Sequence, residues 1–181
     1  MEALSNRALI SLLFTSANER LEDASFDSEN WSKWYQVVQG FTGPEKMVYV
    51  IVKLNQSVTN GGFGEFYERW FGIFAPEIIA ALTEIKADLS AEIVTDSLPI
   101  VNPNGLLDNA YKEFVFNLKL SESQKAQLYA LDVRYDQLHG IENLEDLLGG
   151  FLQAFVGWGF FQKMPGDHFY KTRFYPYIAG Q

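Results

Sequence analysis

The sequence contains no cysteine. Without a thiol, the chain can have no disulfide scaffold, no cysteine nucleophile and no cysteine-ligated zinc or iron–sulfur centre. It also lacks the roughly 18 consecutive apolar residues that a membrane-spanning helix needs. Residues 1–23 mix charges of both signs with apolar side chains, whereas a secretory signal peptide has a basic start and an unbroken apolar run. We therefore expect a soluble, cytoplasmic protein with no membrane partner.

Basic residues are scarce. The chain has 14 Lys and Arg against 23 Asp and Glu, which gives a net charge of -9. Surfaces that bind nucleic acids neutralise phosphates with Lys and Arg, and anionic membranes attract the same side chains. The composition therefore predicts no direct binding of nucleic acid or of a membrane surface, and it favours a cationic partner.

Apolar residues are plentiful and spaced for helices. The chain has 181 residues, of which 48% are hydrophobic, and this suits one domain with one core. We predict an all-α fold, a single-domain multi-helix bundle over residues 1–181. The aromatic-rich tail of residues 157–181 has no firm period and is left unassigned. Helical spacing of apolar residues is found in segments 10–21, 47–58, 63–74, 76–89, 107–118, 121–138 and 144–155.

Several helix boundaries are marked by residues that cap helices. Thr42 and Glu45 have the spacing of a capping box, and the helix after them is apolar on more than one side, as expected of a central helix. Asn60-Gly61-Gly62 predicts the end of this helix, because Asn and Gly tolerate the left-handed backbone of helix C-termini. The other predicted caps are Ser90, which would start a new helix, and Ser121 with Gln124, which would form a second capping box.

Two short segments carry a resemblance to a known family. In the first, Asn60-Gly61-Gly62-Phe63 is followed by Phe66, and in the second, Leu131-Asp132 precedes Tyr135. These segments resemble the signature of a bacterial family of acidic proteins named after DNA mimicry, over roughly residues 45–155. The resemblance implies an all-helical fold and leaves a homodimer open. For function it implies an acidic surface that occupies the DNA-binding face of a basic protein.

Mimicry of DNA needs carboxylates that are spaced like phosphates. Acidic residues at positions i and i+4 of a helix stand about 5–6 Å apart, which is comparable to the spacing of phosphates along a strand. A solvated helix face and the capping of a helix start are the competing interpretations, and both stay open. The candidate residues for an acidic binding face are Glu84, Asp88, Glu92 and Asp96, together with Glu142, Glu145 and Asp146.

One cluster of side chains is a candidate metal site of an enzyme. Asp132, Asp136 and His139 follow one another at i, i+4 and i+7, so one helix face could present two oxygens and a nitrogen to a divalent metal. Three ligands from one helix usually need a fourth from elsewhere, and acidic residues often have this spacing by chance. No nucleophile motif, zinc-protease motif or phosphate loop accompanies the cluster.

The leading hypothesis is a non-enzymatic interaction protein without a cofactor, whose acidic face binds a basic DNA-binding protein such as a transcription regulator or nucleoid protein. One alternative is a metal-dependent or hydrolytic enzyme that uses Asp132, Asp136 and His139. Another is a helical adaptor or immunity-type protein that recognises its partner through aromatic residues. The tail mixes such residues with three cations, which suits packing on the bundle or a second subunit, or stacking on single-stranded nucleic acid.

Overall fold

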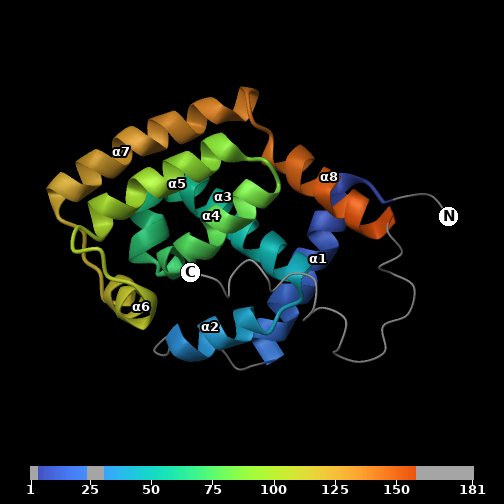
Figure 1. The fold of residues 1–181 in the computed structure, drawn as a ribbon, viewed down its shortest axis with the longest axis horizontal. Coiled ribbons are helices and arrows are strands. Elements are labelled where there is room, and N and C mark those ends of the chain that lie inside the picture. The colour runs from blue at the N-terminus through green and yellow to red at the C-terminus, as the bar shows by residue number, and fades with distance from the viewer. Residues whose placement is uncertain (1–3, 24–30, 158–181) are drawn as a thin grey trace.

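The computed structural model describes residues 4–23 and 31–157 (Figure 1). Every regular element in these two ranges is a helix, so the predicted all-α bundle is confirmed. Of the aromatic-rich tail predicted over residues 157–181, all residues after Gly157 lie outside the described ranges. The elements are α1 (Asn6–Asp23), α2 (Trp31–Gln39), α3 (Gly43–Glu68), the 3₁₀ helix η1 (Phe71–Phe74), α4 (Ala75–Glu84), α5 (Asp88–Val101), α6 (Asp108–Phe116), α7 (Glu122–Asp136), the 3₁₀ helix η2 (Gln137–Gly140) and α8 (Leu144–Gly157).

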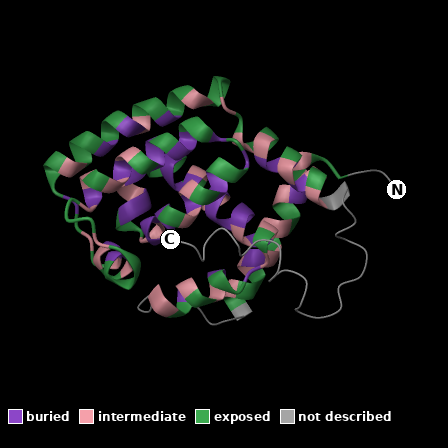
Figure 2. Ribbon diagram, in the orientation of Figure 1, coloured by how far each residue is buried: buried purple, intermediate pink, exposed green. Residues whose placement is uncertain are grey.

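Helix α3 is the central element of the bundle, as predicted. Its start is the predicted capping box, in which the Thr42 hydroxyl accepts the Glu45 N–H at 3.4 Å and the Glu45 carboxylate accepts the Thr42 N–H at 3.0 Å. Helices α1, α4 and α7 all pack against α3. Figure 2 shows buried residues concentrated on the inner faces of the helices around it. The long apolar stretch of this helix therefore forms much of the core.

The remaining helices form two groups around α3. Helix α5 packs between α4 and α7, and α7 runs along an outer edge of the molecule (Figure 1). On the other side, α1 packs on both α3 and α8. The second predicted capping box, Ser121 with Gln124, is present at the start of α7. In the described ranges, no helix combines the length and the apolar character needed to cross a bilayer.

The predicted helix end at Asn60-Gly61-Gly62 falls at a kink, where two helical stretches of α3 meet. Helix α3 continues to Glu68, and only Gly62 leaves the helical region, with φ 73° and ψ -179°. After such a break the next N–H groups lack helical acceptors. The Asp132 carboxylate of α7 provides an acceptor for one of them, the Phe63 N–H, at 2.7 Å. The glycines therefore produce a kink, and a residue from another helix stabilises it.

The predicted N-cap at Ser90 is wrong. Helix α5 begins at Asp88, after Lys86 turns the chain with a φ of 66°. Ser90 lies buried in the first helical turn, and both its N–H and its hydroxyl donate to Glu142. The cap of this helix is therefore a carboxylate 52 residues further along the chain.

Candidate acidic binding surface

The two predicted sets of acidic residues meet at one end of the bundle. Arg134, in the last turn of α7, bonds to Glu92 and Asp96 of α5, so the end of α7 lies beside the middle of α5. Glu142, between α7 and α8, bonds to the first turn of α5. The start of α8 follows immediately (Figure 1). We call this surface the acidic end, and it consists of Asp88, Glu92, Asp96, Glu142, Glu145 and Asp146.

Glu142 joins the two sets. One of its carboxylate oxygens accepts the Leu89 N–H at 3.0 Å, and the other accepts the Ser90 N–H at 2.8 Å and the Ser90 hydroxyl at 2.5 Å. A carboxylate at this position satisfies free N–H groups and interacts favourably with the positive end of the helix dipole. Glu142 is therefore a structural cap, and it fixes the position of the α8 start against α5.

The carboxylates on α5 are partly neutralised. The Arg134 guanidinium lies 3.2 Å from Glu92 and 2.6 Å from Asp96. The hydrogen bond from Arg134 to Asp96 raises the pKa of Arg134, so this side chain stays charged. Exposed ion pairs of this kind contribute only about 0–1 kcal/mol to stability, because solvent screens them. Their main effect here is to reduce the negative charge that α5 presents to solvent.

The other carboxylates of the acidic end face solvent. Glu145 and Asp146 lie exposed in the first turn of α8, where their N–H groups donate to the Asn143 side chain at 3.0 and 3.2 Å. Because Asn143 caps the helix, the two carboxylates are free of that role. Asp88 is also exposed, and within the described ranges no basic side chain forms an ion pair with it or with the α8 pair. Glu92 and Asp96 are exposed as well, at 61% and 44% of their side-chain surface, but they share the single cation Arg134.

Glu84 does not continue the row on α5. It is the last residue of α4, and the turn at Lys86 separates it from Asp88. Burial raises the pKa of the Glu84 carboxyl, although the residue as a whole is exposed. Of the four residues predicted as one row, Asp88, Glu92 and Asp96 therefore keep the i, i+4 spacing on one helix.

A small polar hollow of about 230 Å³ lies next to Glu142. Tyr135 donates its hydroxyl to Asn55 at 3.3 Å, and burial, with a smaller effect of the Glu142 charge, raises the pKa of Tyr135. The Ser90 hydroxyl donates to Glu142 rather than to a histidine. Both hydroxyls are thus held as hydrogen-bond donors within the fold, and the carboxylate that accepts from Ser90 is itself engaged by two backbone N–H groups. The lining residues are Asn55, Ser90, Tyr135, Leu138, His139, Glu142, Asn143, Leu144 and Glu145.

The structure does not bring Asp132, Asp136 and His139 together as metal ligands. Asp132 points inward to the Phe63 N–H, and burial raises its pKa against the opposing effect of that hydrogen bond. Helix α7 ends at Asp136, so the i+7 spacing to His139 does not fall on one α-helix. The latter two side chains lie 4.0 Å apart on the surface. In the described ranges, no group of three His, Asp or Glu residues is arranged to hold a metal ion.

The two segments that carried the family resemblance meet in space. Phe63 is fully buried, and its ring packs edge-on against Tyr135 at 5.8 Å, close to the hydrogen bond from its N–H to Asp132. Residues 60–66 therefore contain both the kink at Gly62 and the aromatic side chain that packs against α7. Sequence reasoning missed their contact with α7. The only signal was the spacing of Asp132 and Tyr135, which places both on one side of a helix.

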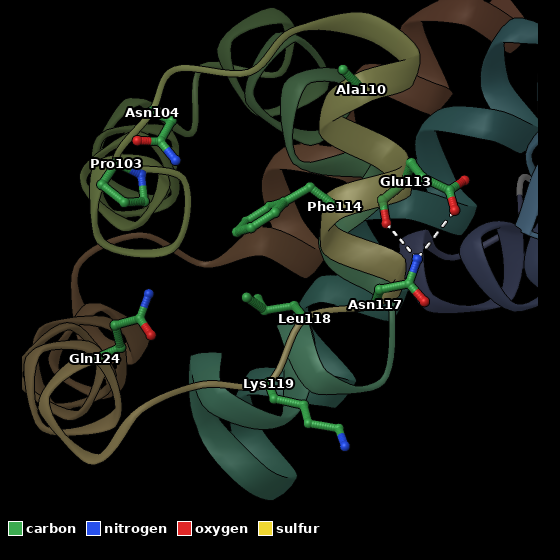
Figure 3. A pocket seen from close by; sticks show the side chains of 9 residues that line it. All are labelled: Pro103, Asn104, Ala110, Glu113, Phe114, Asn117, Leu118, Lys119 and Gln124. Carbon is green, nitrogen blue, oxygen red and sulfur yellow. Dashed lines mark hydrogen bonds between the residues drawn. The ribbon is translucent and has the colours of Figure 1, made fainter.

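A larger and more open cleft of about 710 Å³ lies beside α6 (Figure 3). Phe114 and Leu118 point into it. The carboxylate in the lining of the cleft belongs to Glu113, which accepts hydrogen bonds from Trp31 at 2.6 Å and from Asn117 at 3.2 Å. Its lining contains no pair of nucleophile and base that could support catalysis. The lining residues are Pro103, Asn104, Ala110, Glu113, Phe114, Asn117, Leu118, Lys119 and Gln124.

Comparison with known proteins gives one family match, which covers most of the chain. A family model described as DMP19-like protein matches residues 39–155 of the chain. No curated protein and no solved structure gives a significant match. The matched stretch begins just before α3 and ends within α8, so it contains both the kink at Gly62 and the whole acidic end.

Proposed function

Because the chain belongs to the DMP19-like family, we propose that it is a non-enzymatic interaction protein whose acidic end binds a basic DNA-binding protein in place of DNA. The observation that carries this proposal is the position of Glu142, which joins the acidic residues of α5 to those of α8. Without that contact, the two sets would be separate patches. With it, they form one surface that a cationic partner can cover.

The geometry of the acidic end suits electrostatic recognition. On α5, Asp88, Glu92 and Asp96 follow one another at intervals of four residues, which places neighbouring Cβ atoms about 5–6 Å apart. The first turn of α8 adds Glu145 and Asp146, and both are exposed. Carboxylates at such intervals offer a partner's lysines and arginines the contacts that DNA phosphates would offer.

The chemistry of the partner follows from this surface. A transcription regulator or nucleoid protein exposes a row of Lys and Arg on its DNA-binding face, and that row is complementary to the acidic end. No cofactor takes part, because the interaction consists of charge pairing and exclusion of DNA. Binding between exposed charges weakens as salt rises, since the Debye length falls from about 10 Å at 0.1 M to about 3 Å at 1 M.

A pull-down with the full chain tests the proposal. The immobilised protein is incubated with a bacterial lysate at about 50 mM salt, and bound proteins are eluted either with high salt or with duplex DNA. We expect a basic DNA-binding protein that both treatments release. Recovery of no basic protein at low salt would overturn the proposal. A bound protein that resists high salt and is not displaced by DNA would favour the adaptor alternative.

A further inference from the structure

The sequence contains the dipeptide Asn-Gly twice, as Asn60-Gly61 and as Asn104-Gly105. In this dipeptide the backbone nitrogen of the glycine can attack the side-chain amide of the asparagine, because glycine has no side chain that would shield its nitrogen. All four residues are exposed to solvent. Exposure therefore does not distinguish the two sites, and a difference in their reactivity must come from the backbone around them.

Asn60 and Gly61 lie within regular helix. Both belong to α3, in which only Gly62 leaves the helical region. A helical N–H is bonded to the carbonyl four residues earlier, and the helical backbone holds each side chain away from the nitrogen of the next residue. The Glu65 side chain also lies against Gly61, since an added Cβ there would overlap with its carboxylate. Attack by the Gly61 nitrogen therefore requires that α3 first unwinds locally.

Asn104 and Gly105 lie in the turn between α5 and α6. The Gly105 N–H donates to the Asn102 carbonyl at 3.0 Å, which is the bond that closes a β-turn. An added Cβ at Gly105 would meet nothing within 4 Å. The Asn102 side chain holds the base of the turn, because it donates to the Leu106 carbonyl and accepts the Leu106 N–H, both at 2.9 Å. The tip of the turn can therefore rearrange by breaking one backbone bond, without unwinding either helix.

We propose that Asn104 is a site of spontaneous deamidation in the folded protein, whereas Asn60 is protected by α3. The Gly105 nitrogen forms a bond to the side-chain carbonyl carbon of Asn104. The side-chain nitrogen takes up the proton from Gly105 and leaves as ammonia. The resulting succinimide ring then adds a water molecule and opens to aspartate or isoaspartate. Water is the only co-reactant, so the reaction needs neither an enzyme nor a cofactor.

The reaction changes the larger cleft beside α6. Asn104 and Lys119 both belong to its lining (Figure 3). Either product replaces a neutral amide with a carboxylate, which is ionised at neutral pH. Isoaspartate also lengthens the main chain of the turn by a methylene group. Deamidation therefore alters the charge and the shape of the cleft lining, and none of the residues that form the acidic end takes part.

Peptide mapping by mass spectrometry of the full-length protein tests the proposal. The protein is incubated in mildly alkaline buffer, once folded and once in concentrated urea, and the conversion of each asparagine to its acid is followed over time. In the folded protein we expect Asn104 to convert at least about tenfold faster than Asn60, because its turn opens more readily than a helix. In urea the two sites should convert at similar rates, since the dipeptides are chemically alike.

Two matched variants assign the product in the intact protein. Ion-exchange chromatography of the folded wild type should show a more acidic form that accumulates with time. Asn104→Gln should abolish this form, because glutamine would have to close a larger ring, and Asn60→Gln should leave it unchanged. Equal conversion of the two sites in the folded protein would overturn the proposal, as would an Asn104 that stays intact while both sites react in urea.

Discussion

The contact between α3 and α7 at Phe63 and the acidic end use the same type of side chain in opposite ways. At the first, the half-buried carboxylate of Asp132 accepts a backbone N–H and stabilises a kink. At the second, Asp88, Glu145 and Asp146 are exposed and have no basic partner in the described ranges. A formal net charge of -9 therefore overstates the negative charge that a partner can contact, because some carboxylates are engaged inside the fold.

Glu142 shows that the two roles can coexist in one region. It belongs to the acidic end by position, yet both of its oxygens are engaged by the first turn of α5. Its contribution to a binding surface is indirect, because it fixes α8 against α5. Some carboxylates of the acidic end therefore hold the surface together, and others are exposed where a partner could contact them.

The largest expected effect lies at the kink. Gly62→Ala should destabilise the protein by about 3 kcal/mol, because its backbone region is open almost only to glycine and costs other residues about 1–3 kcal/mol. In addition, the new Cβ would lie 2.4 Å from an Asp132 oxygen, and loss of that hydrogen bond costs about 1–3 kcal/mol. Urea unfolding measures the change in the free energy of unfolding.

Gly64→Ala is the matched control for this prediction. Gly64 lies in the helical part of α3 after the kink, and an added Cβ there meets nothing within 4 Å. Alanine is the better helix former by about 1 kcal/mol. The control should therefore be neutral or stabilised. Equal losses of stability in the two variants would contradict the role assigned to the kink.

Glu45→Gln extends the comparison to a second engaged carboxylate and should cost about 2 kcal/mol at pH 7. Burial alone would raise the pKa of Glu45, but hydrogen bonds from Thr42 and Ser16 and the charge of Arg20 lower it overall. A lowered folded-state pKa gives stability that is present above the unfolded-state value, near 4.5, and is lost as the pH falls through the folded-state value.

Urea unfolding at pH 7 and at about pH 3 checks this dependence. The difference between wild type and Glu45→Gln should be largest at pH 7 and should shrink in acid. Glu122→Gln is the control, because the Glu122 side chain is 94% exposed and such a change stays within about 0.5 kcal/mol at either pH. A cost for Glu45→Gln that does not change with pH would rule out the proposed contribution of its charge.

Glu142→Gln should cost about 1 kcal/mol, which is typical for the loss of a helix cap. The amide keeps one acceptor oxygen but loses the charge that interacts with the start of α5. Glu145→Gln removes the same charge from an exposed position and should change stability by less than about 0.5 kcal/mol. Thermal unfolding of both variants would show whether the structural and the exposed carboxylates differ as described.

The smallest effect on stability is expected for Arg134→Gln, within about 0.5 kcal/mol. The variant frees Glu92 and Asp96 from their ion pairs. Binding of a basic partner should therefore tighten, by about two- to threefold at low salt, since one repulsive cation is removed. Unchanged or weaker binding in a titration at low salt would show that α5 does not face the partner.

Local sequence patterns predicted much of the fold. Both capping boxes were correct because Thr42 with Glu45, and Ser121 with Gln124, act within one turn of helix. The apolar spacing of the central and C-terminal helices was correct for the same reason. Helix α2 was not predicted, because it has only nine residues and buries only Trp34 and Val38, which is too short a stretch to show a period.

The functional residues were harder to assign because their roles depend on distant contacts. Asp132 and Phe63 are 69 residues apart, and Glu142 and Ser90 are 52 apart. In the sequence alone, the spacing of Asp132 to Asp136 and His139 is that of a metal ligand. Ser90 is a residue type that commonly caps helices. Only the packing of α7 against α3 and α5 shows where each carboxylate is engaged. The sequence could therefore supply the candidates but could not sort them into structural and accessible groups.

The most direct test of the account compares two variants that each lose three negative charges. Binding of the recovered basic protein is measured at low salt for both. The first variant combines Asp88→Asn, Glu145→Gln and Asp146→Asn in the acidic end. The second variant combines Glu19→Gln, Glu22→Gln and Glu122→Gln, which lie outside it. If the acidic end is the surface that the partner contacts, the first variant should bind about tenfold more weakly and the second within about twofold of wild type. Equal weakening of both would contradict the account, because only the total charge would then matter.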